Sequence, residues 1–251
     1  DGPLGWLVFD HESRRNAITA EMWQAIPGAA RELDADDSGR VVVMRGAGET
    51  AFVSGADISE FERLRSGDAA RAYDRANASA FGALATIQKP LIALIPGFCV
   101  GGGCAISLTA DLRYAAEDAV FAIPAARLGL GYPAGGLEML VRTVGLPAAK
   151  EIFFTARRFD AAEALRLGLV NEVRPKRELD AYVRSVAEGI AANAPLTLRA
   201  AKRILGELGR PPGERDDSGC SAAIDTCYAS EDYAEGVRAF LEKRAPRFRG
   251  R

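Results

Sequence analysis

The sequence predicts an α/β fold that is followed by a purely helical C-terminal region. In the first 194 residues, apolar runs of the kind found in strands buried on both faces alternate with stretches of helical periodicity. This alternation is typical of stacked, largely parallel β/α units. After about Pro195 no strand-like run occurs, and the remaining segments have amphipathic helical patterns. We therefore predict two parts, an α/β core at residues 1–194 and a helical region at residues 195–251.

The core begins with a strand and a helix. Leu4–Phe9 is a compact apolar run, and a polar turn follows it at His11–Asn16. From Thr19 onward, apolar residues recur at helical spacing, namely Met22, Ile26, Ala29, Ala30 and Leu33. Val41–Met44 is a continuous apolar run, which predicts a second strand that is fully buried.

The same alternation continues along the chain. Strands are expected at 91–95, at 112–115 and around 120–121, and helices after the 51–58 segment, after Gly101, around Glu138 and at 148–154. Beyond the core, helices are expected at 196–208, 214–229 and 231–243, the first two separated by Gly and Pro residues at 209–213. Terminal helices with apolar faces commonly pack on another subunit, so we expect a homo-oligomer; packing on the chain's own core is the alternative.

Composition excludes several classes of protein. The 251 residues include 48% hydrophobic and 26% charged ones, and 32 basic against 34 acidic residues give a net charge of -2. This balance lacks the concentrated basic surface that a nucleic-acid partner requires. No run approaches the roughly 20 apolar residues of a membrane helix. No basic segment followed by an apolar one opens the chain, so we expect a cytoplasmic protein with no membrane partner.

Metal and thiol chemistry are not expected. The four cysteines, Cys99, Cys104, Cys220 and Cys227, have no CxxC spacing, and His11 is the single histidine. We therefore expect neither a metal or redox cofactor nor a cysteine–histidine nucleophile. A histidine that follows a first strand is more often a surface or capping residue than a catalytic one.

Two glycine-bearing segments are the first candidates for chemistry. Residues 51–58 follow one buried strand, and residues 96–104 follow another and contain Gly101, Gly102 and Gly103. Successive glycines at the start of a helix leave backbone N–H groups exposed, which suits an anion or a developing oxyanion. Close packing of that helix on a neighbour explains the glycines equally well. The spacing matches neither a P-loop nor a dinucleotide-binding motif.

Several motifs occur in a specific order along nearly the whole chain. They are Arg15-Asn16-Ala17, Ser54-Gly55-Ala56-Asp57-Ile58, the glycine segment at 97–104, Ala110-Asp111-Leu112-Arg113-Tyr114-Ala115, Arg127-Leu128-Gly129-Leu130, residues 162–170, and Phe240-Leu241-Glu242-Lys243-Arg244. In this order they resemble the crotonase, or enoyl-CoA hydratase/isomerase, superfamily. The resemblance implies a crotonase-like spiral of ββα turns and a C-terminal helical region that forms a homotrimer or a dimer of trimers. It also implies an acyl-CoA substrate, so that coenzyme A enters as part of the substrate.

The resemblance further implies a binding site. The backbone N–H groups of Ala56 and Gly102 would form an oxyanion hole for the thioester carbonyl. Arg14 or Arg15 would approach the phosphates of coenzyme A, the backbone at 56–58 would border adenine and pantetheine, and residues near the C-terminus would reach the ligand of a neighbouring subunit. The substrate-binding set is Arg14, Arg15, Ala17, Ser54, Asp57, Ile58, Val100, Gly101, Ala105, Pro124, Ala125, Phe240 and Lys243. Solvated charges and an N-cap at Asp57 are the simpler explanations for the charged members.

The chain departs from the hydratases of this family at two positions. Those enzymes activate water between two glutamates, and the corresponding positions here are Ala105 and Ala125. Alanine can neither take a proton from water nor protonate Cα, so hydration lacks its acid and its base. The nearest carboxylates in sequence are Glu60, Glu62, Asp111 and Glu138, and surface or capping roles fit them better.

An oxyanion hole without these glutamates favours decarboxylation of a malonyl-type thioester such as methylmalonyl-CoA. Loss of CO2 yields the enolate directly, so no base is needed. Tyr132 stands where the family's methylmalonyl-CoA decarboxylase has a tyrosine that is thought to orient the carboxylate, although that enzyme has a histidine where this chain has Ala56. Tyr132 as a core or rim aromatic is the other interpretation. Two alternative functions stay open, an enoyl-CoA hydratase or isomerase with an atypical acid and base, and a non-catalytic acyl-CoA binder.

Overall fold

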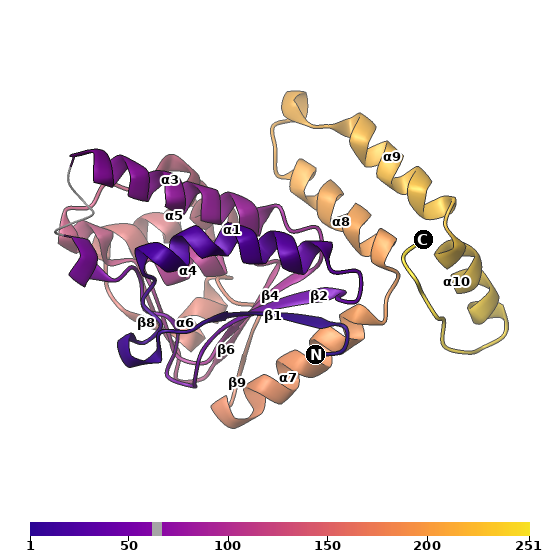
Figure 1. Ribbon diagram of the computed structural model, residues 1–251, viewed down its shortest axis with the longest axis horizontal. Coiled ribbons are helices and arrows are strands. Elements are labelled where there is room, and N and C mark those ends of the chain that lie inside the picture. Colours follow the sequence, from indigo (N-terminus) through magenta and orange to yellow (C-terminus); the bar gives the residue numbers. More distant parts are fainter. Residues whose placement is uncertain (62–66) are drawn as a thin grey trace.

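The computed structural model describes residues 1–61 and 67–251, which form two β-sheets with helices packed around them (Figure 1). The larger sheet has the strand order β1-β2-β4-β6-β9, and its strands are all parallel. The smaller sheet has the order β3-β5-β7-β8, with an antiparallel pair at β7–β8. The strands are β1 (Leu4–Phe9), β2 (Val41–Gly46), β3 (Ala51–Val53), β4 (Leu91–Ile95), β5 (Phe98–Val100), β6 (Leu112–Ala116), β7 (Val120–Ala122), β8 (Phe159–Asp160) and β9 (Glu172–Arg174). The expected α/β class with a largely parallel sheet is confirmed.

The chain winds as a spiral in which a strand of the larger sheet is followed by a strand of the smaller one and then by a helix. The pairs β2–β3, β4–β5 and β6–β7 each make one such turn. The core helices are α1 (Ala20–Ala35), α3 (Gly67–Ala85), α4 (Gly102–Ser107), α5 (Ala134–Thr155), α6 (Ala161–Arg166) and α7 (Lys176–Ala191), with 3-10 turns η1 (Glu12–Arg14), η2 (Ile58–Glu60) and η3 (Pro124–Leu128). This is the ββα spiral that the resemblance implies.

The continuous apolar run of β2 contributes side chains to two hydrophobic clusters. Val42 and Met44 belong to a cluster that includes side chains of α1, α3 and α4, whereas Val41 and Val43 belong to a second cluster beneath α7. Successive side chains of a strand point to opposite faces of the sheet, so both faces are covered and every position from Val41 to Met44 is apolar. The sequence-based prediction of a fully buried strand is therefore confirmed for Val41–Met44 of β2.

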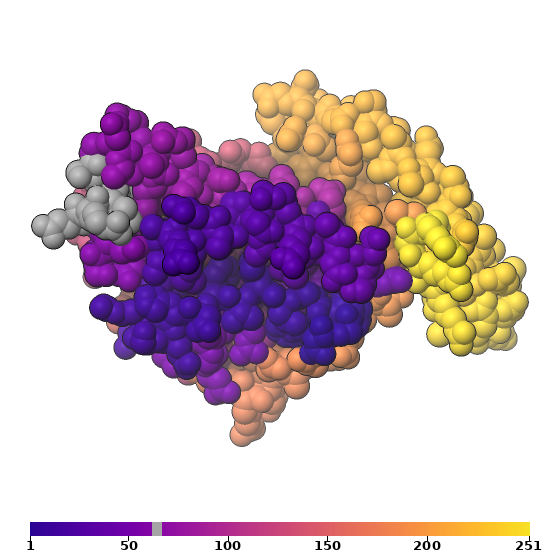
Figure 2. All heavy atoms as spheres, viewed as in Figure 1, coloured from indigo at the N-terminus to yellow at the C-terminus, as the bar shows by residue number. Residues whose placement is uncertain are grey.

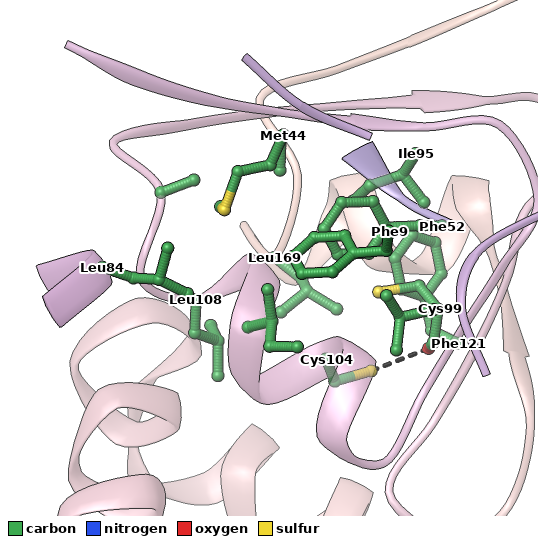
Figure 3. Close-up of a cluster of buried hydrophobic side chains, with 14 of the residues drawn as sticks. Phe9, Met44, Phe52, Leu84, Ile95, Cys99, Cys104, Leu108, Phe121 and Leu169 are labelled. Atoms are coloured by element: carbon green, nitrogen blue, oxygen red, sulfur yellow. Dashed lines mark hydrogen bonds between the residues drawn. The ribbon is translucent and has the colours of Figure 1, made fainter. Parts of the chain in front are cut away.

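Figure 3 shows part of the first cluster, at the junction of the two sheets. The rings of Phe9 and Phe52 meet edge to face with their centroids 5.6 Å apart. Cys104 belongs to the same cluster and donates its thiol hydrogen to the carbonyl oxygen of Cys99 at 2.8 Å (Figure 3). This contact fixes α4 against β5, and both thiols are buried.

The sequence predicts the long apolar strands and the short strand β7 (Val120–Ala122), but not the other short strands. The strands β3, β5, β8 and β9 have only two or three residues and were not predicted. The helix expected after residues 51–58 falls partly on residues 62–66, which lie outside the described residues; the described elements on either side are η2 and α3. α7 was also omitted, although its buried residues Leu179, Val183, Ala187 and Ala191 recur every four positions.

The C-terminal helices extend away from the core (Figures 1 and 2). They are α8 (Pro195–Leu208), α9 (Asp217–Tyr228) and α10 (Glu231–Leu241), with the 3-10 turn η4 (Pro212–Glu214) between the first two. The buried carboxylate of Asp232 accepts hydrogen bonds from the N–H groups of Arg249 and Gly250 at 2.6 and 2.7 Å, which ties the C-terminal tail to α10. Within the described residues, no helix combines the length and the apolar character needed to cross a membrane.

Candidate active site

A cavity of about 910 Å³ lies beside the N-terminus of α4. Its wall is formed by the segment after β3, one face of α3, the start of α4, η3 with the loop that follows, and the start of α5. The residues expected at the site that line it are Arg14, Ala17, Ser54, Ala56, Asp57, Ile58, Val100, Gly101, Gly102, Ala105, Pro124, Ala125 and Tyr132. The fold thus gathers motifs that are far apart in the sequence around one cavity.

The backbone N–H groups of Ala56 and Gly102 lie close together in this wall. A Cβ at Gly102 would lie 3.8 Å from the nitrogen of Ala56. Ile18 fixes the backbone around Ala56, because its N–H donates to the Gly55 carbonyl at 2.8 Å and its own carbonyl accepts from the Asp57 N–H at 2.9 Å. Gly102 begins α4, where the first N–H groups have no partner within the helix. Across residues 1–61 and 67–251, neither N–H donates to another protein group, so both are available to a ligand oxygen.

The three consecutive glycines have different structural roles. Gly101 has a φ of 54°, in the left-handed region that favours glycine, and turns the chain into α4. A Cβ at Gly103 would lie 2.1 Å from the carbonyl oxygen of Val53, so this glycine permits close packing of α4 on β3. A Cβ at Gly102 would make only ordinary contacts, 3.5 Å from Trp23, but it would take up space beside the Ala56 N–H.

Tyr132 contributes a phenol to the cavity wall. Its ring packs edge to face on Phe153, with the centroids 5.3 Å apart, and it covers Gly136, where a Cβ would lie 2.7 Å from the ring. Burial, with a smaller contribution from Cys104, raises the pKa of Tyr132 to about 12, so the phenol is protonated at neutral pH. Its hydroxyl has no hydrogen-bond partner in the part of the chain that the structure describes.

Ala105 and Ala125 make a neighbouring part of the wall apolar. Both line the cavity, and each is only 4% exposed. Ala105 lies on α4, where its N–H donates to the Gly101 carbonyl at 3.1 Å, and Ala125 lies on η3. The two methyl groups therefore occupy positions where the resemblance to hydratases would require carboxylates.

The carboxylates that are nearest in sequence are engaged elsewhere. Glu60 accepts a hydrogen bond from the Ala20 N–H at 2.8 Å, at the start of α1. Asp111 pairs with Lys202 at 2.7 Å, and Glu138 pairs with Arg142 at 2.7 Å on the surface. Glu62 lies outside the described residues.

Among the described residues, the carboxylates in the cavity wall are Asp57 and Asp74. Asp57 caps η2, where it accepts hydrogen bonds from the Ser59 hydroxyl at 2.6 Å and the Ser59 N–H at 3.0 Å. The hydrogen bond from the Ser59 hydroxyl is the main reason that the pKa of Asp57 is lowered. Asp57 is therefore ionised at neutral pH, and it fills the N-cap role that was the alternative for it.

The wall formed by α3 was not anticipated from the sequence. It presents Asp74, Asn77, Ala78, Phe81, Gly82 and Ala85 to the cavity. Trp23 on α1 lines the cavity beside this wall, with its indole N–H donating to the Tyr73 hydroxyl at 3.1 Å and its ring centroid 5.3 Å from that of Phe81. No recognisable motif marks these residues, and only the four-residue spacing of Tyr73, Asn77 and Phe81 could have placed them on one helix face.

Three of the expected binding residues do not line the cavity. The guanidinium of Arg15 lies over the ring of Phe98, 4.6 Å from its centroid, whereas Arg14 lies at the cavity. Phe240 and Lys243 are exposed at the end of α10, in the projecting C-terminal part.

These observations define the class of protein: its fold is a ββα spiral, and unpaired backbone N–H groups lie at an apolar cavity. Over residues 6–251 the chain matches the model of a family described as enoyl-CoA hydratase/isomerase. A short-chain-enoyl-CoA hydratase from Clostridium acetobutylicum is 32% identical over 97% of this chain and 93% of its own. A crotonyl-CoA hydratase from Syntrophomonas wolfei is 34% identical over 98% of this chain and 94% of its own.

Solved structures agree with this result. A crystal structure of an enoyl-CoA hydratase/carnithine racemase from Magnetospirillum magneticum is 36% identical, with a TM-score of 0.93 over 100% of this chain and 94% of that chain. The present chain therefore belongs to the enoyl-CoA hydratase/isomerase family and is an enzyme of the crotonase superfamily.

Proposed function

We propose that this protein acts on an acyl-CoA thioester and stabilises its enolate with the backbone N–H groups of Ala56 and Gly102. Two observations support this proposal, the unpaired N–H groups that lie close together at the cavity and the relatives named as hydratases of CoA thioesters. As the enolate forms, negative charge develops on the thioester oxygen, and fixed donors stabilise that charge. Removal of one such donor in a comparable site costs about 3–4 kcal/mol.

Within this class of reaction, we propose decarboxylation of a malonyl-type acyl-CoA. The observation that carries the proposal is the cavity wall, which combines the methyl groups of Ala105 and Ala125 with the unpaired phenol of Tyr132. Decarboxylation creates the enolate without a general base, so the alanines are no obstacle to it. An apolar wall also removes water from the leaving carboxylate.

The proposed step uses Tyr132 to hold the substrate carboxylate. With a pKa of about 12, the phenol keeps its proton and donates a hydrogen bond instead of adding a second negative charge. The bond between Cα and the carboxylate carbon breaks, its electron pair enters the thioester to form the enolate, and CO2 leaves. The N–H groups of Ala56 and Gly102 donate to the enolate oxygen, and water then supplies a proton to Cα.

The proposed binding mode for coenzyme A involves two subunits. Arg14 and the backbone at 56–58 line the cavity of one subunit and contact the phosphates and pantetheine. Phe240 and Lys243 reach the ligand from a neighbouring subunit of a homotrimer or a dimer of trimers. The 84% exposure of Phe240 supports this arrangement, because such a large apolar side chain is normally covered by a partner.

The test is an incubation of the protein with methylmalonyl-CoA and crotonyl-CoA in one mixture, followed by mass spectrometry, with protein-free and boiled controls. We expect the malonyl thioester to lose the mass of CO2 while crotonyl-CoA is unchanged. Gain of water by crotonyl-CoA without loss of CO2 would contradict the proposal. Tight binding of both thioesters with no turnover would indicate a non-catalytic acyl-CoA binder.

Hydration is the second candidate function, and the names of the relatives favour it. Its acid and base would have to be atypical, because Ala105 and Ala125 have no ionisable group. The double variant Ala105→Glu with Ala125→Glu tests whether the two carboxylates are all that hydration lacks. A large gain of crotonyl-CoA hydration would indicate a pocket that still fits a hydratase substrate, whereas no gain is expected if the pocket is shaped for decarboxylation.

A further inference from the structure

Asn77 places an unsatisfied acceptor in the cavity wall. It lies on α3 and lines the cavity, and its side-chain oxygen Oδ1 is buried with no hydrogen-bond partner in the described part of the chain. A buried polar atom without a partner is destabilising and therefore rare in folded proteins. An apolar side chain at this position would avoid the cost of an unsatisfied acceptor. The presence of an amide therefore indicates a hydrogen-bond donor that comes from outside the chain.

The position of Asn77 assigns that partner to the acyl end of the cavity. Tyr73 and Phe81, four residues before and after Asn77 on the same helix face, both contact Trp23. Trp23 in turn lies 3.5 Å from where a Cβ of Gly102 would be. Asn77 therefore lies on the face of α3 that contacts Trp23, and Trp23 in turn lies beside the N–H groups proposed to hold the thioester oxygen.

The chemistry of the Asn77 amide indicates a neutral donor. On α3, Asp74 lines the wall one turn before Asn77, whereas the wall residues that follow Asn77, namely Ala78, Phe81 and Gly82, have no side-chain hydrogen-bonding groups. A hydrogen bond to a neutral amide oxygen is too weak to offset the cost of burying a charged donor. The smaller cost of burying a hydroxyl is offset by one good acceptor. The small side chains at 78 and 82 also leave room for a substituent beside the amide.

Arg174 carries the other buried side-chain atom without a hydrogen-bond partner among the described residues. Its guanidinium lies over the Tyr182 ring, 4.1 Å from the centroid, and forms an ion pair with Glu172 at 2.9 Å. Arg174 is on β9 and does not line the cavity. Contacts within the protein account for Arg174, whereas none accounts for the Asn77 oxygen.

We propose that Asn77 is a specificity-determining residue that accepts a hydrogen bond from a hydroxyl group on the acyl part of the substrate. This inference rests on the proposed function only in requiring that the cavity binds acyl-CoA thioesters. It adds a hydroxyl group to the acyl part of the substrate, beside the carboxylate of the malonyl-type group proposed above. A water molecule held by Asn77 is the competing source of the same O–H donor.

The test compares butyryl-CoA with 2-, 3- and 4-hydroxybutyryl-CoA by calorimetric titration of the full chain. One neutral hydrogen bond corresponds to about a tenfold change in affinity, so we expect at least one hydroxylated ligand to bind about tenfold more tightly than butyryl-CoA. In Asn77→Leu this preference should fall below about twofold, while butyryl-CoA binds as well as before or better. Ser79→Ala, an exposed change on α3 away from the cavity, should keep the wild-type preference.

Several outcomes would overturn the inference. Equal binding of all four thioesters would show that water, not substrate, satisfies Asn77. A hydroxyl preference that persists in Asn77→Leu would assign recognition to another residue. If no acyl-CoA binds, the proposed function fails together with the inference, whereas equal binding removes the inference alone. Thermal unfolding of Asn77→Leu without ligand should occur at or above the wild-type temperature, because the variant loses an unpaired buried acceptor.

Discussion

Tyr132 carries the hydroxyl on which the proposed decarboxylation depends, and this hydroxyl has no hydrogen-bond partner among the described residues. We expect Tyr132→Phe to lower the turnover of methylmalonyl-CoA by well over tenfold, because the carboxylate loses its donor while the ring still packs on Phe153. Coenzyme A affinity should stay within about twofold, since the phenol is not among the proposed coenzyme A contacts. Steady-state kinetics and a titration with free coenzyme A measure both effects.

Tyr182→Phe is the matched control for this variant. Tyr182 lies on α7 and packs against Tyr114 outside the cavity and outside the C-terminal helices. Its turnover should equal that of the wild type. Unchanged turnover in Tyr132→Phe would remove the phenol from the mechanism.

The raised pKa of Tyr132 has a consequence for stability. The pKa is about 12 in the folded protein and about 10 in an unfolded chain, so folding favours the protonated phenol. This contribution is complete below pH 10 and is lost as the pH rises towards 12. By pH 11 we expect the free energy of unfolding of the wild type to have fallen by about 1 kcal/mol more than that of Tyr132→Phe. Urea unfolding of both proteins at pH 9, 10 and 11 measures the difference, and parallel curves would show that the phenol is not buried.

At the scale of single residues, the sequence was informative where a residue belongs to a motif. Ala105 and Ala125 could be assigned to the cavity because the glycine segment and the proline before Ala125 define their positions. Asn77 belongs to no motif, and its place in the wall depends on how α3 packs on α1. Arg14 and Arg15 are adjacent in sequence, and only the three-dimensional turn reveals that Arg14 lines the cavity while Arg15 stacks on Phe98.

At the scale of elements, two neighbouring glycines at the start of α4 have different roles: Gly103 allows close packing, and Gly102 lies at the proposed binding site. Gly103 lies where a Cβ would be 2.1 Å from the Val53 carbonyl oxygen, a backbone atom that has little freedom to move. We expect Gly103→Ala to lower the free energy of unfolding by about 1–3 kcal/mol, as overpacking does. Gly102→Ala should unfold like the wild type but lose at least tenfold in turnover, because its methyl group lies beside the Ala56 N–H.

The two variants serve as controls for each other when urea unfolding and turnover are measured on both. The folded fraction of Gly103→Ala should have the turnover of the wild type. Gly102→Ala should have reduced turnover even when it is fully folded. Full activity in Gly102→Ala would indicate that the substrate oxygen does not bind between the two N–H groups.

The elements that could be predicted are those whose length or burial leaves a pattern. β2 and β4 are apolar at successive positions because each strand faces two clusters, and α1 has a regular helical spacing that begins at its Thr19 N-cap. Strands of two or three residues such as β8 leave no periodicity, because their pairing is decided by the turns around them. α7 does leave such a pattern in the sequence, because its buried residues recur every four positions.

At the scale of the whole molecule, the projecting C-terminal helices expose an apolar surface. Leu205, Leu208, Tyr228, Phe240 and Leu241 are all more than half exposed, and the last two are exposed by 84% and 74%. A group of large apolar side chains on one region of a folded chain usually marks a contact with another subunit. The same region carries Lys243, which contacts coenzyme A in the proposed binding mode only across a subunit boundary.

Assembly and ligand binding should therefore be lost together. We expect Phe240→Glu to reduce the mass of the particle from a trimer, or a hexamer, towards the monomer, because a charge placed in an apolar interface lacks a partner. Coenzyme A affinity should fall with it, since Phe240 and Lys243 of the neighbouring subunit no longer reach the ligand. Val8→Glu, which introduces the same charge at an exposed apolar position outside this region, should leave both the mass and the affinity unchanged. Light scattering coupled to gel filtration measures the mass, and calorimetry measures the affinity. A variant that stays assembled would place the interface elsewhere, and one that dissociates but binds coenzyme A normally would confine the ligand contacts to a single subunit.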